Sequence, residues 1–164
     1  MGRPRTQAAP EPLNPMTKLF TVDERVRWSA VDKAGIIFYG AYVRFFELAE
    51  MELFRTAGVP YGEVFDRWDM WLPRVHLESD FHYPARLDDE LRVAAYFTRF
   101  GTRSLQINFD VLHLGANRLA VTGHEVLVCT TRDTLKSRPL PDDLVELLSP
   151  FLLTEEEARA ELGL

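Results

Sequence analysis

The sequence predicts an α+β protein in which a curved antiparallel sheet surrounds one long helix. Three observations support this fold class. One strongly apolar helical pattern lies near residues 39–57, four long strand patterns follow it, and the last three strands are joined by short turns. Strands that follow one another through short turns pair as an antiparallel meander. The aromatic-rich helix is expected to pack inside the curve of the sheet, because its apolar stripe must be buried.

A first strand is predicted at residues 19–28, where apolar and charged side chains alternate. Phe20 and Val22 fall on one side of this strand and Asp23 falls on the other. A period of two is typical of a strand that buries one face. A loop over residues 29–35 is expected to connect this strand to the helix.

The helical period begins at Tyr39 or Gly40 and continues to Ala57. Apolar residues recur there at intervals of three and four, which places them on one face of a helix. This face carries Tyr42, Phe46, Ala49 and Leu53. The Gly-Val-Pro sequence that follows is expected to end the helix, since proline cannot continue one.

The four later strands are predicted at residues 71–83, 90–99, 104–114 and 118–132, with turn-forming residues between them. Residues 61–69, which precede them, are expected to be irregular or to form a short helix.

Two short helices are predicted at residues 142–148 and 154–162, after prolines that end the sheet region. Thr154 is the expected N-cap of the second helix, because glutamates fill the first turn behind it.

A length of 164 residues suits one domain with a proper core. We expect a disordered, proline-rich tail over residues 1–18, the α+β domain over residues 19–140 and a helical extension over residues 141–164. The tail contains arginines with no apolar segment behind them, so it does not have the pattern of a secretory signal.

The formal net charge of −6 argues against nonspecific binding to nucleic acid or to an anionic membrane. Charges interrupt every apolar run before it reaches transmembrane length. The one cysteine, Cys129, stands in a β-branched run and is expected to be a small buried hydrophobe rather than a nucleophile. These features predict a cytoplasmic protein with no nucleic acid or membrane partner.

Familiar motifs for phosphate loops, dinucleotide binding, serine nucleophiles and zinc proteases are absent from the sequence. His76, Glu78, Asp80 and His82 alternate along one face of a predicted strand, as metal ligands or acid-base groups could. A strand face that meets solvent or another subunit explains the same pattern. We favour that interpretation, because no spacing elsewhere in the sequence completes a metal site. We therefore expect no metal and no resident cofactor.

Asp32 lies in an otherwise apolar loop that leads directly into the predicted helix. Burial beside Ile36 and Ile37 would leave its carboxylate less hydrated and more basic. The first N–H groups of a helix have no internal acceptor, so they can polarise a carbonyl oxygen. An activated carbonyl placed between these features would meet a base or nucleophile on one side and donors on the other. A turn closed with Gly35 is the commoner role of a loop aspartate, and the residues alone leave both roles open.

Several segments resemble the 4-hydroxybenzoyl-CoA thioesterase-like branch of the hotdog superfamily. They are Asp-Lys-Ala-Gly-Ile-Ile-Phe-Tyr at residues 32–39 and Tyr-Val-Arg-Phe-Phe-Glu at residues 42–47. Phe-His-Tyr-Pro at residues 81–84 looks like the beginning of the family's third strand, and Arg-Pro-Leu-Pro at residues 138–141 looks like its exit from the sheet. The resemblance covers residues 20–148.

The resemblance implies a hotdog fold that associates as a homodimer or homotetramer, with active sites between subunits. It implies an acyl-CoA thioesterase acting on a small aryl or a short- or medium-chain acyl group, with coenzyme A entering only as part of the substrate. Asp32 is then the catalytic carboxylate, as nucleophile or general base. The backbone N–H groups of Tyr39 and Gly40 would hold the thioester oxygen. Lys33 and the Gly40-Ala41 pair depart from the family pattern, which bears on the substrate more than on the reaction.

Glu47 and Glu50 on the helix are rival carboxylates, because another hotdog branch keeps its catalytic carboxylate on the helix. A surface or interface acid, paired with Arg44 or Arg55, is the alternative role of Glu47. Tyr42 and Glu47 are therefore carried as candidate substrate contacts.

The phosphates of coenzyme A need cations despite the acidic composition of the whole chain. The candidate nucleotide patch consists of Arg99, Arg103, Arg132, Lys136 and Arg138. Ordinary solvated charges at strand ends explain each of these residues equally well.

Two other functions remain open at this point. One is a non-catalytic module that binds acyl thioesters or regulates in response to them, with Asp32 in a structural role. The other is a hotdog hydratase or dehydratase of enoyl thioesters. Those relatives usually carry a histidine beside the acid, and no histidine occurs between Asp32 and Trp71.

Overall fold

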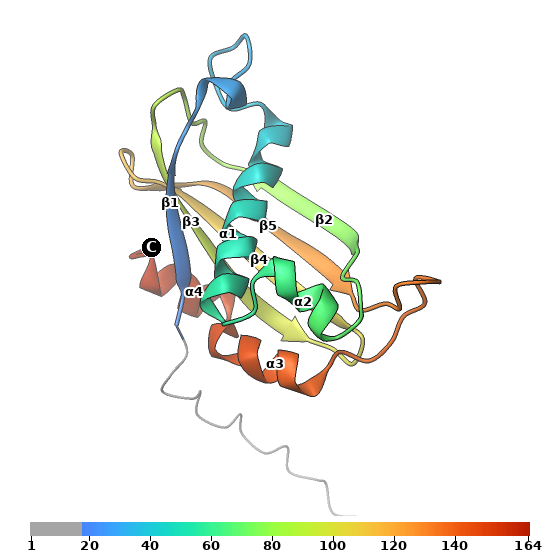
Figure 1. The fold of residues 1–164 in the computed structure, drawn as a ribbon. Helices are drawn as coiled ribbons and strands as arrows, with labels where there is room; N and C mark the ends of the chain where they lie inside the picture. The colour runs from blue at the N-terminus through green and yellow to red at the C-terminus, as the bar shows by residue number, and fades with distance from the viewer. Residues whose placement is uncertain (1–17) are drawn as a thin grey trace, which may run out of the picture.

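The computed structural model describes residues 18–164. Of the tail predicted at residues 1–18, residues 1–17 lie outside the described part of the chain. The rest forms an α+β fold in which one long helix lies across an antiparallel sheet, as the sequence predicts (Figure 1).

The sheet has five strands in the order β1-β3-β4-β5-β2, and every neighbouring pair is antiparallel. The strands are β1 (Phe20–Arg25), β2 (Arg74–Phe81), β3 (Glu90–Phe100), β4 (Ser104–His113) and β5 (Arg118–Val128). The predicted meander is confirmed, because β3, β4 and β5 pair in chain order. The two strands with longer connections, β1 and β2, occupy the edges.

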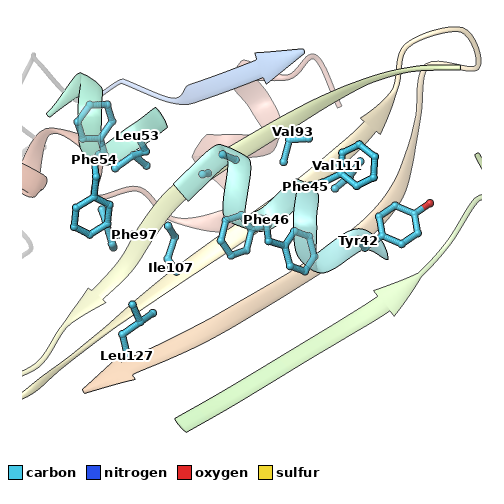
Figure 2. Packing of buried hydrophobic residues seen from close by; sticks show 14 of the residues in the cluster. Tyr42, Phe45, Phe46, Leu53, Phe54, Val93, Phe97, Ile107, Val111 and Leu127 are labelled. Carbon is cyan, nitrogen blue, oxygen red and sulfur yellow. The ribbon is translucent and has the colours of Figure 1, made fainter. Parts of the chain in front are cut away.

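The long helix α1 (Tyr42–Thr56) covers one face of the sheet, and its predicted apolar stripe is buried there. A single 3-10 turn (Tyr39–Ala41) precedes it, so the predicted start of the helical segment holds but its first turn is tighter than an α-helix. Figure 2 shows Phe46 in the middle of this interface. Its ring stacks on Phe109 of β4 with centroids 4.5 Å apart. Each fully buried side chain of this kind contributes roughly 1.5–3 kcal/mol.

Three short helices complete the fold: α2 (Tyr61–Arg67), α3 (Asp142–Leu148) and α4 (Glu155–Glu161). Helix α4 packs on the face of the sheet opposite α1, where Ala158 meets Ala94 and Tyr96 of β3. Thr154 caps α4 in a capping box with Glu157, which confirms the predicted N-cap. Both faces of the centre of the sheet are therefore covered.

The edge strand β2 is exposed along nearly its whole length. Its apolar side chains Val75, Leu77 and Phe81 have exposed fractions of 63%, 48% and 56%. The physical reason is that α1 lies over the other strands and leaves this edge uncovered (Figure 1). A long edge strand with free backbone groups and exposed apolar side chains is a ready template for pairing with another strand.

Four of the five predicted strands end earlier than expected, and β5 shows the largest difference. β5 ends at Val128, and the segment after it makes only isolated bridges from Thr130 to Trp71 and Ser137. Cys129 is buried, as predicted. Within residues 18–164, no helix is long and apolar enough to cross a membrane. The cytoplasmic location stays a prediction.

Candidate active site

Asp32 forms a tight turn immediately before the helix segment. Its Oδ1 accepts a hydrogen bond of 2.8 Å from the N–H of Ala34, and its carbonyl accepts one of 3.0 Å from the N–H of Gly35. Gly35 has a φ of +74°, a left-handed conformation that favours glycine and explains this residue in the turn. The side chain of Asp32 is thus held by its own turn, the structural role that the sequence left open.

A second loop supports this turn from behind. The N–H of Ile37 donates to the carbonyl of Ala85 at 2.9 Å, and Ile36 forms a bridge with Arg86. That supporting loop is closed by Asp89, whose Oδ2 accepts from the N–H of Arg86 at 2.7 Å and lies 2.9 Å from Nε2 of His113. The position of Asp32 is therefore fixed by backbone contacts on both sides of it.

The expected burial of Asp32 is wrong for a single chain, because the side chain is exposed. The turn stands at the rim of the fold, and nothing in residues 18–164 covers it. Neither Asp32 nor Lys33 makes a salt bridge to another described residue. The carboxylate consequently keeps its Oδ2 free of any described partner, and that oxygen is available for chemistry.

The expected hydrogen-bond donors stand at the start of the helical segment. Ala41 donates to the carbonyl of Phe38 at 2.8 Å, whereas no described residue accepts a hydrogen bond from the N–H of Tyr39 or Gly40. A Cβ atom on Gly40 would lie 2.7 Å from Cε1 of the exposed Phe38 ring, so a larger residue at this position would displace that ring. Two backbone donors are thereby left free, as expected for the first residues of a helix.

Asp32 and Tyr39 line the same groove, whose volume of about 360 Å³ falls within the ordinary range for small-molecule sites. Ile36 and Ile37 form part of its apolar lining. Tyr42 of α1 and Phe81 of β2, with ring centroids 5.8 Å apart, also line it, and residues 82–85 complete the lining. The carboxylate and the helix start therefore meet at one mainly apolar depression. Tyr42, predicted as a substrate contact, belongs to it.

The rival carboxylates have different environments from Asp32. Glu47 is exposed and makes no ion pair with a described residue, so the suggested pairing with Arg44 or Arg55 is absent; Arg55 pairs with Glu52 instead. Glu47 does not line the groove. Neither observation gives it a role in the candidate site.

Glu50 is fully buried and forms a polar network that the sequence did not predict. It accepts hydrogen bonds from the hydroxyl of Tyr61 and from Nη2 of Arg74. Nε of Arg74 also donates to the buried Glu125 of β5 at 2.6 Å. Burial raises the pKa of Glu50, while Arg74 and Tyr61 oppose that effect. Glu50 is thus charge-compensated inside the fold and does not reach the groove.

One signal in the sequence could have indicated the burial of Glu50. It continues the spacing of four from Tyr42 and Phe46, so it falls on the buried stripe of the helix. Arg74, which pairs with Glu50, and Glu125, which pairs with Arg74, come from two different strands, and no local pattern places them beside Glu50.

The five residues of the candidate nucleotide patch gather at the opposite end of the sheet from Asp32. Arg103 donates to the carbonyl of Ser137 at 2.8 Å, which joins the β3–β4 turn to the segment that carries Arg132, Lys136 and Arg138. Strand β3 has 11 residues and spans roughly 33 Å at about 3.3 Å per residue. Figure 1 shows the loop after β1 and the segment after β5 at opposite ends of the fold.

These basic residues are also partly engaged. Arg132 pairs with Asp66 at 2.5 Å and lies over the ring of Trp71, with 4.5 Å from its guanidinium carbon to the ring centroid. Arg138 donates to the carbonyls of Trp68 and Asp69 at 3.2 Å. A single chain does not bring the patch and Asp32 together.

The sequence profile of the thioesterase-like superfamily matches residues 26–148. The acyl-CoA thioester hydrolase YbgC of Escherichia coli O6:H1 is 26% identical over 129 residues, which cover 79% of this chain and 95% of that protein. The 1,4-dihydroxy-2-naphthoyl-CoA hydrolase of Synechococcus elongatus is 23% identical over 124 residues, 75% of this chain and 90% of its own.

Solved structures show the same fold. A 1,4-dihydroxy-2-naphthoyl-CoA thioesterase from Synechocystis superposes with a TM-score of 0.74 at 21% identity, over 80% of this chain and 96% of that one. A thioesterase-superfamily protein from a Jannaschia species gives a TM-score of 0.74 at 28% identity, over 88% and 99% of the two chains. These neighbours confirm the predicted hotdog fold.

Proposed function

The chain belongs to the thioesterase-like superfamily and is a thioester hydrolase, and we propose that it cleaves acyl-CoA thioesters with Asp32 as the catalytic carboxylate. The single observation that carries this proposal is the shared groove, which both Asp32 and Tyr39, the first residue of the helical segment, line. The free Oδ2 of Asp32 and the two free N–H groups supply the opposite polarities that hydrolysis of a carbonyl compound needs.

The reaction has two routes that use the same groups. In the first, an Asp32 oxygen attacks the thioester carbon, the C–S bond breaks, and coenzyme A leaves as a thiolate; water then hydrolyses the acyl-aspartyl anhydride. In the second, Asp32 removes a proton from a water molecule, the resulting hydroxide attacks the same carbon, and collapse of the tetrahedral intermediate breaks the C–S bond and releases coenzyme A. In both, the N–H groups of Tyr39 and Gly40 stabilise the oxyanion. A thiolate leaves easily, since a thiol of the cysteine type has a pKa of about 8.5.

A small aryl or a short- or medium-chain acyl group suits the groove. Its lining is apolar and aromatic, with Tyr42 and Phe81 placed to contact a ring or an alkyl chain. The aryl side of this range is supported by relatives that act on 1,4-dihydroxy-2-naphthoyl-CoA. The short- and medium-chain acyl groups are supported by the similarity to the acyl-CoA thioester hydrolase of Escherichia coli.

Self-association through β2 would complete this site. Two copies of β2 that pair edge to edge about a twofold axis run antiparallel, so the Phe81 end of one lies beside the Arg74 end of the other. The candidate nucleotide patch lies at that second end. A homodimer of this kind would place the basic residues of one copy toward Asp32 of the other, and two such dimers would give the expected homotetramer. The exposed apolar side chains of β2 support this assembly.

One observation favours the non-catalytic alternative. The hydrogen bond from Ala34 to Asp32 is the contact of an aspartate that merely shapes a turn. An acyl-thioester binding module would keep this contact and use the groove without hydrolysis. The test must therefore separate the carboxylate charge from the turn.

The substitution Asp32→Asn makes that separation, because asparagine keeps an oxygen at the same place to accept from Ala34. We would measure free-thiol release from a panel of aryl-, short-chain and medium-chain acyl-CoA thioesters, using the wild type, Asp32→Asn and the control Glu47→Gln. We expect turnover by the wild type and the control, and a loss of at least about 100-fold in Asp32→Asn, the scale of one essential acid-base group. Equal rates in wild type and Asp32→Asn would remove Asp32 from the chemistry. No turnover of any thioester would favour the binding module.

A further inference from the structure

Three potential metal ligands converge on the outer face of the sheet, away from the groove. His76 and Glu78 come from β2 and His124 comes from β5, and their ligand atoms all lie within 4.8 Å of one another. Glu78 and His124 are direct cross-strand partners. Nε2 of His76 is already 3.6 Å from Oε2 of Glu78, and the two imidazole rings are 5.2 Å apart. We propose that these three side chains form a zinc-binding site.

The hydrogen bonds of the histidines single out the same two residues. His82 is 2.8 Å from the hydroxyl of Thr122, and both ring nitrogens of His113 have partners. Among the residues that the structure describes, neither His76 nor His124 has a hydrogen-bond partner for its ring. The two imidazoles with available lone pairs are therefore the two that face each other across a carboxylate.

The surroundings of the cluster attract a cation. A polar hollow of about 160 Å³ begins at Glu78 and His124 and continues along the outer face of the sheet. Asp80, Asp110 and Glu155 also line it, and the one positively charged side chain in its lining is Arg159. Carboxylates thus outnumber guanidinium groups beside the site, which lowers the potential there and favours a divalent ion.

The ligand set indicates which ion. Two imidazole nitrogens and one carboxylate oxygen suit zinc, which binds both types and leaves a fourth position to water. Zinc bonds of about 2.0–2.2 Å put tetrahedral donors roughly 3.3–3.6 Å apart. The separation of 3.6 Å between His76 and Glu78 is close to that value, so only small side-chain rotations are needed to bring in His124. Calcium and magnesium prefer oxygen ligands alone and would bind poorly.

The sequence argued against a metal here because its spacing offers no further ligand beside His76 and Glu78. His76 and Glu78 were expected to lack ligands from elsewhere in the chain, and the fold supplies His124 from the neighbouring strand. The ion would join the edge strand β2 to β5, its one strand partner in the described sheet. Zinc would then stabilise the strand whose free edge is proposed to pair with a second copy.

The test is zinc titration of the untagged full-length chain by isothermal titration calorimetry, after removal of metals with a chelator. We expect saturable binding of one zinc per chain and no binding of magnesium. Removing a residue that only hydrogen-bonds to a metal ligand typically lowers metal affinity about 10–100-fold. Removing a ligand should cost more, so His124→Ala and His76→Ala should each weaken zinc binding by at least ~100-fold. The matched control is His82→Ala, which removes an exposed histidine just beyond the end of β2 and should leave the affinity unchanged.

Thermal unfolding provides a second measurement on the same variants. Zinc should raise the Tm of the wild type and of His82→Ala but not that of His124→Ala, because only a ligand that binds the folded state stabilises it. Far-UV circular dichroism would verify that each variant is folded. The proposal is overturned if no saturable zinc binding occurs, if His76→Ala and His124→Ala bind as tightly as the wild type, or if His82→Ala weakens binding equally. None of these outcomes depends on thioester hydrolysis.

Discussion

Replacing Arg74 by methionine tests the buried network most directly. Within residues 18–164, Arg74 is the one cation that contacts both Glu50 and Glu125, whose side chains are 1% and 3% exposed. Methionine preserves most of the apolar stem and removes the charge, so the two carboxylates lose their compensation. Breaking a buried ion pair in this way typically costs about 3–5 kcal/mol. Arg74 itself is 40% exposed, and solvent therefore screens part of the interaction.

We accordingly expect Arg74→Met to lower the free energy of unfolding by about 3 kcal/mol, the lower end of that range. For a domain of this size the Tm should fall by roughly 6–12 °C. The assay is urea unfolding followed by circular dichroism, at one fixed chain concentration because the protein is proposed to self-associate. A matched control is Arg92→Met, since Arg92 is also 40% exposed but pairs with the half-exposed Asp23. Its loss should cost at most about 1 kcal/mol.

The stability effect of Arg74→Met should also depend on pH, because Glu50 can take up a proton. Burial already raises the pKa of Glu50 above its usual value of 4.5, so the folded state holds this proton more tightly than the unfolded state. Such a group makes stability fall as pH rises, and the loss of Arg74 must increase that effect. The difference between Arg74→Met and the wild type should therefore shrink as the pH is lowered toward 4.5. Adding Glu50→Gln should restore at least about 1 kcal/mol at neutral pH. Equal stabilities of Arg74→Met and Arg92→Met, or no recovery in the double variant, would refute the account.

Three further predictions concern other parts of the fold. Burial raises the pKa of Asp110, although Arg159 opposes this effect. The wild type should therefore lose stability as the pH rises above about 4. In Asp110→Asn the urea midpoint should depend less on pH between pH 4 and 7. Thr154→Ala removes the capping box of α4 and should cost about 1 kcal/mol in urea unfolding, whereas Thr154→Ser should be nearly neutral. Leu77→Arg places a charge on the exposed apolar face of β2 and should give a smaller species in sedimentation velocity with unchanged circular dichroism.

Each of these predictions has a contrary result. A pH profile of Asp110→Asn that parallels the wild type would mean that Asp110 does not hold its proton more tightly in the folded state. A neutral Thr154→Ala would mean that α4 does not depend on its cap. An unchanged sedimentation coefficient in Leu77→Arg would exclude the β2 face as the interface.

The elements could be predicted from sequence because their signals are local. The turn residues that bound β3 and β4, the stripe of α1 and the cap at Thr154 all depend on residues within a few positions of one another. Strand ends were less predictable, since residues 129–132 have strand-like composition but leave the ladder after Val128. Pairing with a neighbouring strand decides such ends, and a single segment carries no information about its neighbour.

The candidate site was predictable only in part. The position of Asp32 before a helix start follows from the chain order, and the structure places both on one groove. The exposure of Asp32 did not follow, because apolar neighbours in sequence say nothing about whether another surface covers a turn. The convergence of His124 on His76 and Glu78 could not be predicted from the sequence either, because it depends on the register between β2 and β5.

The exposure of Asp32, the uncovered face of β2 and the remote nucleotide patch have a common explanation in a second copy of the chain. Each is unfavourable or unexplained in one chain: a carboxylate without cover, an apolar edge in water, and basic residues at the far end of β3, a strand about 33 Å long at about 3.3 Å per residue, from the candidate carboxylate. Pairing of two β2 strands about a twofold axis addresses all three at once. Leu77→Arg should therefore lower kcat/KM for acyl-CoA far more than a control substitution that introduces one arginine on the surface of α3. A monomeric Leu77→Arg variant with full kcat/KM would show that one chain holds the whole site.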